Sequence, residues 1–195
     1  LMYWQVYLHK TVISLENVLI KILKRAKELT LLKKNIPSTS SLDIFLKQDL
    51  TINDFKKDKT LINHFSKLDD HDIYFCLKEW SNEKDFILSS LSKIILQRRP
   101  LKIITQNQKF NSKRINKIKE KIQKKFEIKN QESDYLVFTN KVSNNAYQYE
   151  KQDINILMKD GSIKDITEAS DQFNIESLSK TVNKYFLCFP KIASD

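Results

Sequence analysis

Apolar residues in the first hundred positions recur at three- and four-residue steps, the spacing of one helix face. The longest such pattern predicts a single helix over residues 1–32, with charged side chains largely outside its apolar stripe of Val12, Leu15, Leu19, Ile22, Leu23, Ala26 and Leu29. The segment 35–41 breaks the pattern and predicts a loop. The first five residues carry no capping side chain, so we expect the chain to continue from a longer helix and to be part of a longer protein.

Shorter helices follow this loop, because polar capping residues precede each apolar run. We expect Thr51 to cap a helix over 52–55, Thr60 to begin one that ends at Leu68, and Asp69 or Asp70 to cap the next, which reaches Trp80. Residues 81–97 predict another amphipathic helix that ends before Pro100, with its apolar face formed by Phe86, Ile87, Leu91, Ile94 and Ile95.

The pattern changes after residue 100. Short β-type runs at 101–105, 135–139 and 185–189 predict strands, and the Asp160-Gly161 pair predicts a hairpin turn between 154–158 and 163–167. Helices are expected over 111–125 and 174–181. The predicted fold class is therefore α+β, a mainly helical first half followed by a small, mostly antiparallel sheet with two helices. We divide the chain into a helical region, 1–100, and an α+β subdomain, 101–195.

Composition excludes several classes of protein. The 195 residues include one glycine, so no glycine-rich phosphate loop or dinucleotide fingerprint can form. Two distant cysteines indicate neither a zinc site nor a disulfide framework. The chain contains no apolar run of about 20 residues to span a bilayer and no signal-peptide pattern, so we expect a cytoplasmic protein without a membrane partner.

The segment Asp69-Asp70-His71-Asp72 invites two interpretations. A His-Asp pair can bind a metal, but such a site needs further ligands, and His64 is the nearest candidate. Acidic residues at a helix start also complement the helix dipole and cap free N–H groups. We favour the cap.

The net charge of +10 is concentrated in the helix predicted over 111–125. One interpretation is a surface for nucleic acid or another polyanion; the other is an ordinary solvated face, since lysine is abundant throughout the chain and no aromatic residue is interleaved for base stacking. The candidate polyanion surface consists of Lys113, Arg114, Lys117, Lys121 and Lys124.

Two stretches together resemble a known family. Residues 2–12 read MYWQVYLHKTV and resemble the helix after the catalytic core of HD-domain phosphohydrolases, including deoxynucleoside triphosphate triphosphohydrolases. The segments ILMKDG (156–161), DITEASD (165–171) and KYFLCFPK (184–191) resemble the C-terminal end of a bacterial, Bacteroidetes-like subgroup, as do LDDHDI (68–73) and KEW (78–80).

The resemblance implies that the family's metal ligands, His, His-Asp and Asp, precede residue 1, where a divalent metal polarises phosphate and activates water. This chain is then the C-terminal fragment of a nucleotide phosphohydrolase, with no catalytic residue and no cofactor of its own, inactive alone. Its partners would be the missing HD domain, a nucleotide and a second copy in a homo-oligomer. Tyr7, His9 and Lys10 match substrate-binding positions. Leu8 replaces a common glutamine and cannot make its hydrogen bond to the nucleotide.

Two functions of other classes remain open. A basic module centred on the 109–129 segment would bind nucleic acid or another polyanion without enzymatic activity. A dimerisation module would act through protein contacts only.

Overall fold

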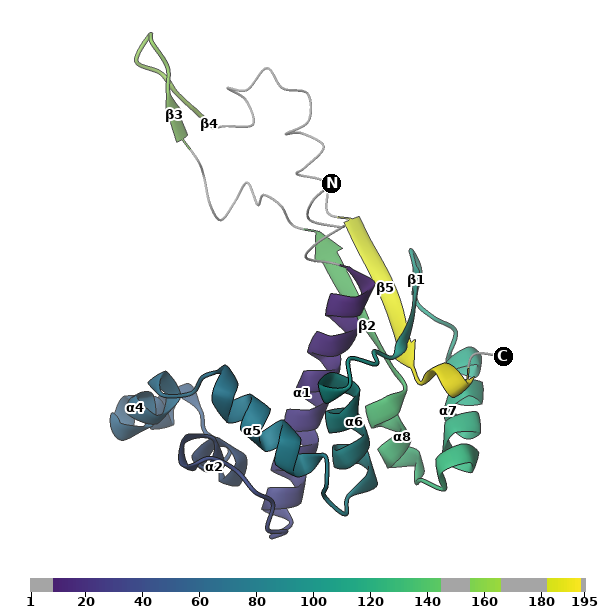
Figure 1. Ribbon diagram of the computed structural model, residues 1–195. Coiled ribbons are helices and arrows are strands. Elements are labelled where there is room, and N and C mark those ends of the chain that lie inside the picture. Colours follow the sequence, from purple (N-terminus) through teal and green to yellow (C-terminus); the bar gives the residue numbers. More distant parts are fainter. Residues whose placement is uncertain (1–8, 145–154, 166–181, 194–195) are drawn as a thin grey trace.

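The computed structural model describes residues 9–144, 155–165 and 182–193 (Figure 1). In chain order the helices of this part are α1 (Lys10–Leu31), α2 (Ser40–Lys47), α3 (Ile52–Lys57), α4 (Thr60–Ser66), α5 (Asp70–Trp80), α6 (Phe86–Leu96), α7 (Ser112–Phe126), α8 (Asn130–Leu136) and the 3₁₀ helix η2 (Lys191–Ala193). The strands are β1 (Lys102–Gln106), β2 (Phe138–Asn144), β3 (Asn155–Leu157), β4 (Ile163–Asp165) and β5 (Val182–Phe189). The α+β class predicted from the sequence is confirmed.

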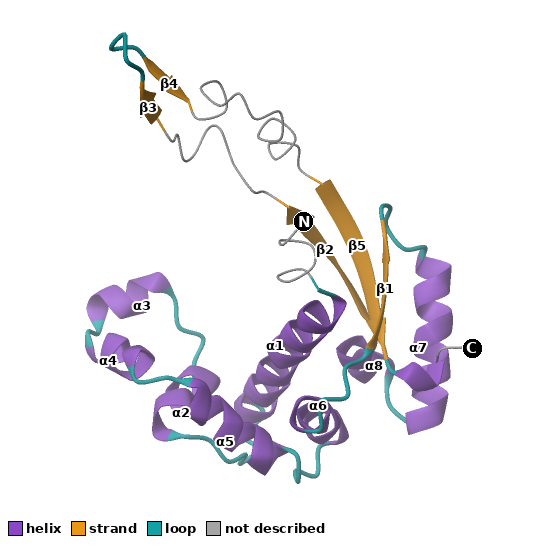
Figure 2. Ribbon diagram, turned by 45° about the horizontal axis from the view of Figure 1, so that its top comes forward, coloured by secondary structure: helices purple, strands orange, loops and turns teal. Residues whose placement is uncertain are grey.

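Helix α1 is the central element of the helical half and packs against α2 and α6 (Figure 2). The predicted helix over 1–32 is not continuous through His9, which has extended backbone angles and is the N-cap of α1; residues 1–8 lie outside the described part. The predicted stripe is confirmed at Ile22, Ala26 and Leu29 and is wrong at its start. Val12 is 47% exposed, whereas the side chains that enter the core are Ile13, Val18, Ile22, Ala26 and Leu29.

Helices α2, α3 and α4 form a short helical array, in which α2 packs against α1 and against α4. Thr51 caps α3, and α4 begins at Thr60, as predicted. Each of these helices contributes one ring to an aromatic cluster, with centroid separations of 6.1–6.3 Å among Phe45, Phe55 and Phe65. Aromatic pairs at this distance add to the stability that burial provides.

Helices α5 and α6 complete the helical half. Asp69 caps α5, and the indole N–H of Trp80 at its end donates a hydrogen bond of 2.7 Å to the Pro37 carbonyl. The helix predicted over 81–97 begins later, at Phe86, because the Asp85 side chain accepts the N–H of Leu88 and caps it there. Phe86 is 40% exposed and does not enter the core as predicted.

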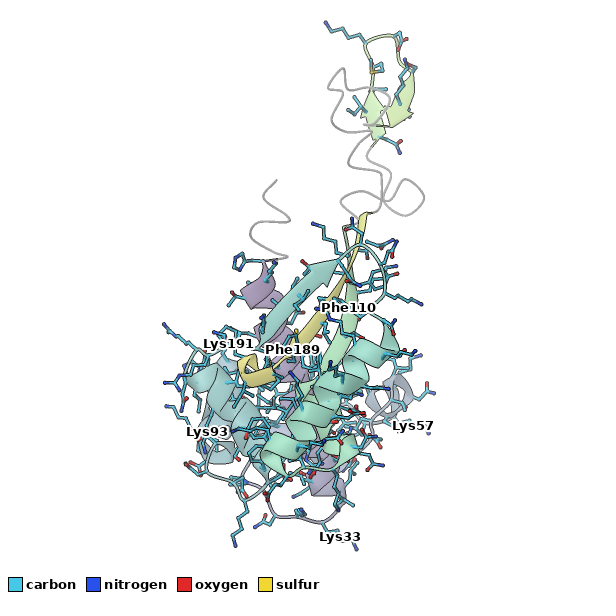
Figure 3. All side chains as sticks on the ribbon, turned by 90° about the vertical axis from the view of Figure 1, so that its right-hand side faces the viewer. Lys33, Lys57, Lys93, Phe110, Phe189 and Lys191 are labelled. Carbon is cyan, nitrogen blue, oxygen red and sulfur yellow. The ribbon has the colours of Figure 1, made fainter. Side chains whose placement is uncertain are left out.

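The sheet has the order β1-β5-β2 with all neighbours antiparallel. It lies between α1 on one side and α7 on the other (Figures 1 and 3). The strand predicted over 135–139 is wrong in its first half, since α8 extends to Leu136 and β2 begins at Phe138. Helix α7 is confirmed, whereas the helix predicted over 174–181 lies outside the described residues.

A second, two-stranded sheet pairs β3 with β4. Its turn contains Gly161 at φ 83°, a conformation that costs glycine little, so the predicted Asp-Gly hairpin is confirmed. One cluster of buried side chains runs through both halves of the chain and includes Ile22, Leu77, Ile122 and Leu187. The division at residue 100 stays a prediction.

Shortening a buried side chain at the centre of α1 tests whether this helix packs in the core as described. Ile22 is fully buried, so Ile22→Ala should lower the free energy of unfolding by about 2–5 kcal/mol, through lost transfer energy and a residual cavity. Ile20 on the same helix is 44% exposed, so Ile20→Ala should cost about 0.5 kcal/mol. Urea denaturation followed by circular dichroism measures both, and equal losses would contradict the packing described.

Candidate functional site

The residues predicted to form a pocket wall lie at the start of α1. His9 is the N-cap, and its Nδ1 accepts the N–H of Thr11 at 3.3 Å. Lys10 is the first helical residue, and both side chains are exposed. Tyr7 and Leu8 lie outside the described residues. Substrate contacts by Tyr7, His9 and Lys10 therefore stay predictions.

The acidic segment at the start of α5 is a capping box. Asp69 accepts the N–H groups of His71 and Asp72, and the Asp72 side chain accepts the N–H of Asp69. These N–H groups, that of Asp72 first, hold the pKa of Asp69 below its usual range. The side chain of His71 is 96% exposed. Within the described part of the chain no three His, Cys, Asp or Glu side chains are grouped to hold a metal ion.

The basic helix α7 borders a pocket of about 330 Å³, which we call the α7 pocket. Three of the five predicted basic residues line it, namely Arg114, Lys117 and Lys121. Their spacing of three and four residues places them on one flank of the helix. Lys113 and Lys124 are exposed and are not among the lining residues.

The opposite wall of the α7 pocket comes from the sheet. Lys102 on β1 adds a fourth cation, which the pattern along the helix could not indicate because this residue lies on another element. Lys102 pairs with Phe189 of β5, so the two side chains share the face toward α7. The other lining residues are Ile104, Ile118, Phe189 and Ala193. No carboxylate occurs among the described residues that line this pocket.

Four cationic side chains around an apolar floor suit an anionic ligand. The Arg114 guanidinium lies 5.9 Å from the centre of the Phe110 ring, a cation–π contact that restrains it while its N–H groups can still bind an anion. The α7 pocket is therefore a candidate anion site. This site is recognised because basic residues from two elements, β1 and α7, line the same pocket on one face of the sheet.

A second polar cluster, also missed from the sequence, joins α1, α6 and α8. Arg25 of α1 binds Asp85 through two contacts, Nε–Oδ1 at 3.1 Å and Nη2–Oδ2 at 2.7 Å. Its Nη1 contacts Glu28 Oε2 at 2.7 Å, and its Nη2 lies 3.5 Å from Glu132 of α8. The Arg25 and Asp85 side chains are only 11% and 12% exposed. Three carboxylates thus neutralise Arg25, which leaves it unsuited to bind an external anion.

The same cluster shifts the pKa of its members. Hydrogen bonds from Arg25 and from the N–H of Leu88 outweigh burial and hold the pKa of Asp85 below its usual range. Burial, aided by the hydrogen bond that Tyr135 Oη donates to Glu28 at 2.9 Å, raises the pKa of Tyr135 to about 12. Asp85 is thus ionised and Tyr135 neutral at pH 7. The cluster holds three helices together.

Comparison with known proteins sets these sites in context. The sequence matches no protein-family profile. It is 26% identical over 198 residues to the uncharacterized protein YwfO of Bacillus subtilis, an alignment that covers 97% of this chain and 42% of YwfO. The crystal structure of a phosphohydrolase (BT4208) from Bacteroides thetaiotaomicron matches at 39% identity and a TM-score of 0.85, over 96% of this chain and 47% of that one.

The chain is related to a phosphohydrolase. It spans less than half the length of each of these two relatives. The resemblance to phosphohydrolases expected from the sequence is confirmed at this level. None of the helices in the described segments has the length and apolar character needed to cross a bilayer.

Replacing Asp85 by asparagine keeps the helix cap but removes the charge opposite Arg25. Asp85→Asn should lower the free energy of unfolding at pH 7 by about 3 kcal/mol, since it leaves a nearly buried guanidinium without its main partner. As a matched control, Asp49→Asn removes an ion pair to Lys27, also on α1, from a side chain that is 80% exposed. This control should cost less than about 1 kcal/mol.

The pH dependence of this difference has a definite sign. The folded-state pKa of Asp85 is lowered, so its contribution is complete above the unfolded pKa of about 3.9 and is lost as pH falls through the lower folded value. Urea denaturation at several pH values should show Asp85→Asn approaching the wild type in stability only under acid conditions. A difference that stays constant to the lowest pH would contradict the charge pairing.

Proposed function

We propose that this chain is the C-terminal part of a metal-dependent, HD-type phosphohydrolase that acts on nucleotides in the cytoplasm as a homo-oligomer. The observation that carries the proposal is the match to the Bacteroides phosphohydrolase, which extends over 96% of this chain at 39% identity. The sequence resemblance of residues 2–12 and 156–191 supports the finer assignment.

The residues described here do not fit a metal site, because no three potential ligand side chains are grouped among them. We therefore assign no reaction step to this chain through a metal. Its proposed contribution is binding. The exposed Lys10 at the start of α1 supplies positive charge for a nucleotide phosphate, and His9 and Tyr7 complete the wall of the pocket.

The reading frame upstream of Leu1 tests this proposal. We expect it to encode helices that carry a His…His-Asp…Asp set. The purified 195-residue chain should hydrolyse no deoxynucleoside triphosphate with Mg²⁺ or Mn²⁺, because it lacks those ligands, whereas the product of the full frame should. A frame that begins at Met2, or metal-dependent hydrolysis by the 195-residue chain, would contradict the proposal.

A second candidate function, polyanion binding, is favoured by one specific observation. Lys102, Arg114, Lys117 and Lys121 come from two elements and line one pocket. If these residues formed only an ordinary solvated face of α7, a basic residue of a second element would not be expected to line the same pocket. A phosphate chain or a nucleic-acid backbone would suit this arrangement, whether or not the complete protein is a hydrolase.

Two double variants of α7 distinguish binding in the α7 pocket from non-specific attraction to a basic helix. Arg114→Ala/Lys117→Ala and Lys113→Ala/Lys124→Ala each remove two cations, but only the first pair lines the α7 pocket. With a 20-nucleotide single strand and with inorganic polyphosphate, we expect the first variant to bind about tenfold more weakly and to reduce the salt slope by about 2.

The second variant should bind within about threefold of the wild type. Fluorescence titration at two salt concentrations measures both affinities and slopes. Equal losses would indicate diffuse attraction, and absence of binding at low salt would exclude the function. Light scattering of the same samples reports whether the chain associates with itself.

A further inference from the structure

A larger pocket, of about 480 Å³, lies between the loop before α7 and the strands β2 and β5. We call it the β2–β5 pocket. Its volume falls within the range of small-molecule sites, roughly 300–1,000 Å³. Its lining residues are Lys109, Phe110, Thr139, Asn140, Lys141 and Tyr185, and of these only Phe110 also contacts the α7 pocket, through Arg114.

The register of the sheet places an aromatic ring beside a cation in this pocket. Lys141 of β2 is directly opposite Tyr185 of β5, so their side chains lie next to each other on one face. Thr139, two residues before Lys141, is on that same face. The strands therefore supply a ring, an amine and a hydroxyl to one small area.

The loop supplies the facing wall. Phe110 is only 9% exposed, and the Arg114 guanidinium lies 5.9 Å from its ring centre, so this ring is held in place. Figure 3 shows Phe110 just before α7, on the side of the sheet that this helix covers. Lys109, its neighbour in the chain, is exposed. The pocket is thus bordered by aromatic rings from two separate elements.

Charge narrows the class of ligand. The only ionised groups among the described lining residues are Lys109 and Lys141, and no carboxylate accompanies them. Two cations favour an anion, and aromatic walls favour a flat ring. The Thr139 hydroxyl can donate and accept a hydrogen bond, which suits the polar edge of a heterocycle, whereas the Asn140 Oδ1 already accepts the backbone N–H of Lys141 at 2.8 Å.

We propose that the β2–β5 pocket binds a nucleoside monophosphate. Its base stacks on Tyr185, and its phosphate is held by Lys109 and Lys141. This assignment rests on the pocket alone and does not depend on the hydrolase proposal. Binding is therefore measured directly, on the full 195-residue chain and without any hydrolysis assay.

Three probes separate the two parts of the ligand. In calorimetric titrations AMP should bind, while adenosine, which lacks the phosphate, and ribose 5-phosphate, which lacks the base, should each bind at least about tenfold more weakly. Ribose 5-phosphate binding as tightly as AMP would overturn the proposal, because the rings would then have no role. Absence of AMP binding at millimolar concentration would overturn it as well.

Variants locate the binding site. Tyr185→Leu and Lys141→Ala should each weaken AMP binding about tenfold, whereas Tyr185→Phe, which keeps the ring, should stay within about threefold. Lys93→Ala, on the exposed side of α6, serves as the charge-matched control for Lys141→Ala and should leave AMP binding unchanged. Equal AMP binding by Lys141→Ala and the wild type would overturn the proposal.

Two further measurements check that the variants fold and that the ligand is a mononucleotide. Thermal unfolding of each variant shows whether Tyr185→Leu folds; where it does not, Lys141→Ala and Tyr185→Phe decide the result. A ten-nucleotide single strand is titrated in parallel. A strand that binds while AMP does not would identify a nucleic-acid surface instead of a mononucleotide site and would overturn the proposal.

Discussion

A nearly buried guanidinium links helices α1, α6 and α8 of this protein. A charge removed from water must find partners, and Arg25 finds them on three elements: Glu28 on its own helix, Asp85 at the start of α6 and Glu132 on α8. The planar fork of arginine accepts only a narrow range of positions for the Asp85 carboxylate. The contact therefore sets where α6 begins as well as where it lies.

Helix α8, which Arg25 holds against α1, in turn fixes the position of α7, the helix that borders the candidate sites. Gln123 of α7 donates hydrogen bonds to Asn130 at 3.0 Å and Ser133 at 3.1 Å, and Lys119 pairs with Asp134. These contacts fasten α7 to α8, which Arg25 fastens to α1. Helix α7 then covers one face of the sheet in a defined position, and the flank that carries Arg114 and Lys117 faces β1.

Local signals were the part of the fold that could be predicted from the sequence. The caps at Thr51 and Asp69, the amphipathic helix α7 and the Asp160-Gly161 turn each depend on residues a few positions apart, so the pattern contains all the information needed. Two predictions were wrong at places where a residue distant in the sequence determines the local structure. The start of α6 depends on Asp85 and its partner Arg25, sixty positions away. Residues 135–136 have a strand-like composition, yet they form the end of α8, where Tyr135 donates a hydrogen bond to Glu28 of α1.

The candidate sites show the same limit for side-chain chemistry. From the sequence, the basic helix lacked aromatic neighbours, an argument against a site that recognises bases. That argument considered one helix in isolation. In the fold, Phe110 precedes this helix and touches Arg114 through its ring, and the central strand brings Tyr185 to the same face of the sheet. Periodicity along one element identifies which of its residues are exposed, but only the pairing of distant strands determines what those residues face. Basic residues become candidates for a specific site when a second element closes a pocket around them, as β1 does for Arg114 and Lys117 but not for Lys113.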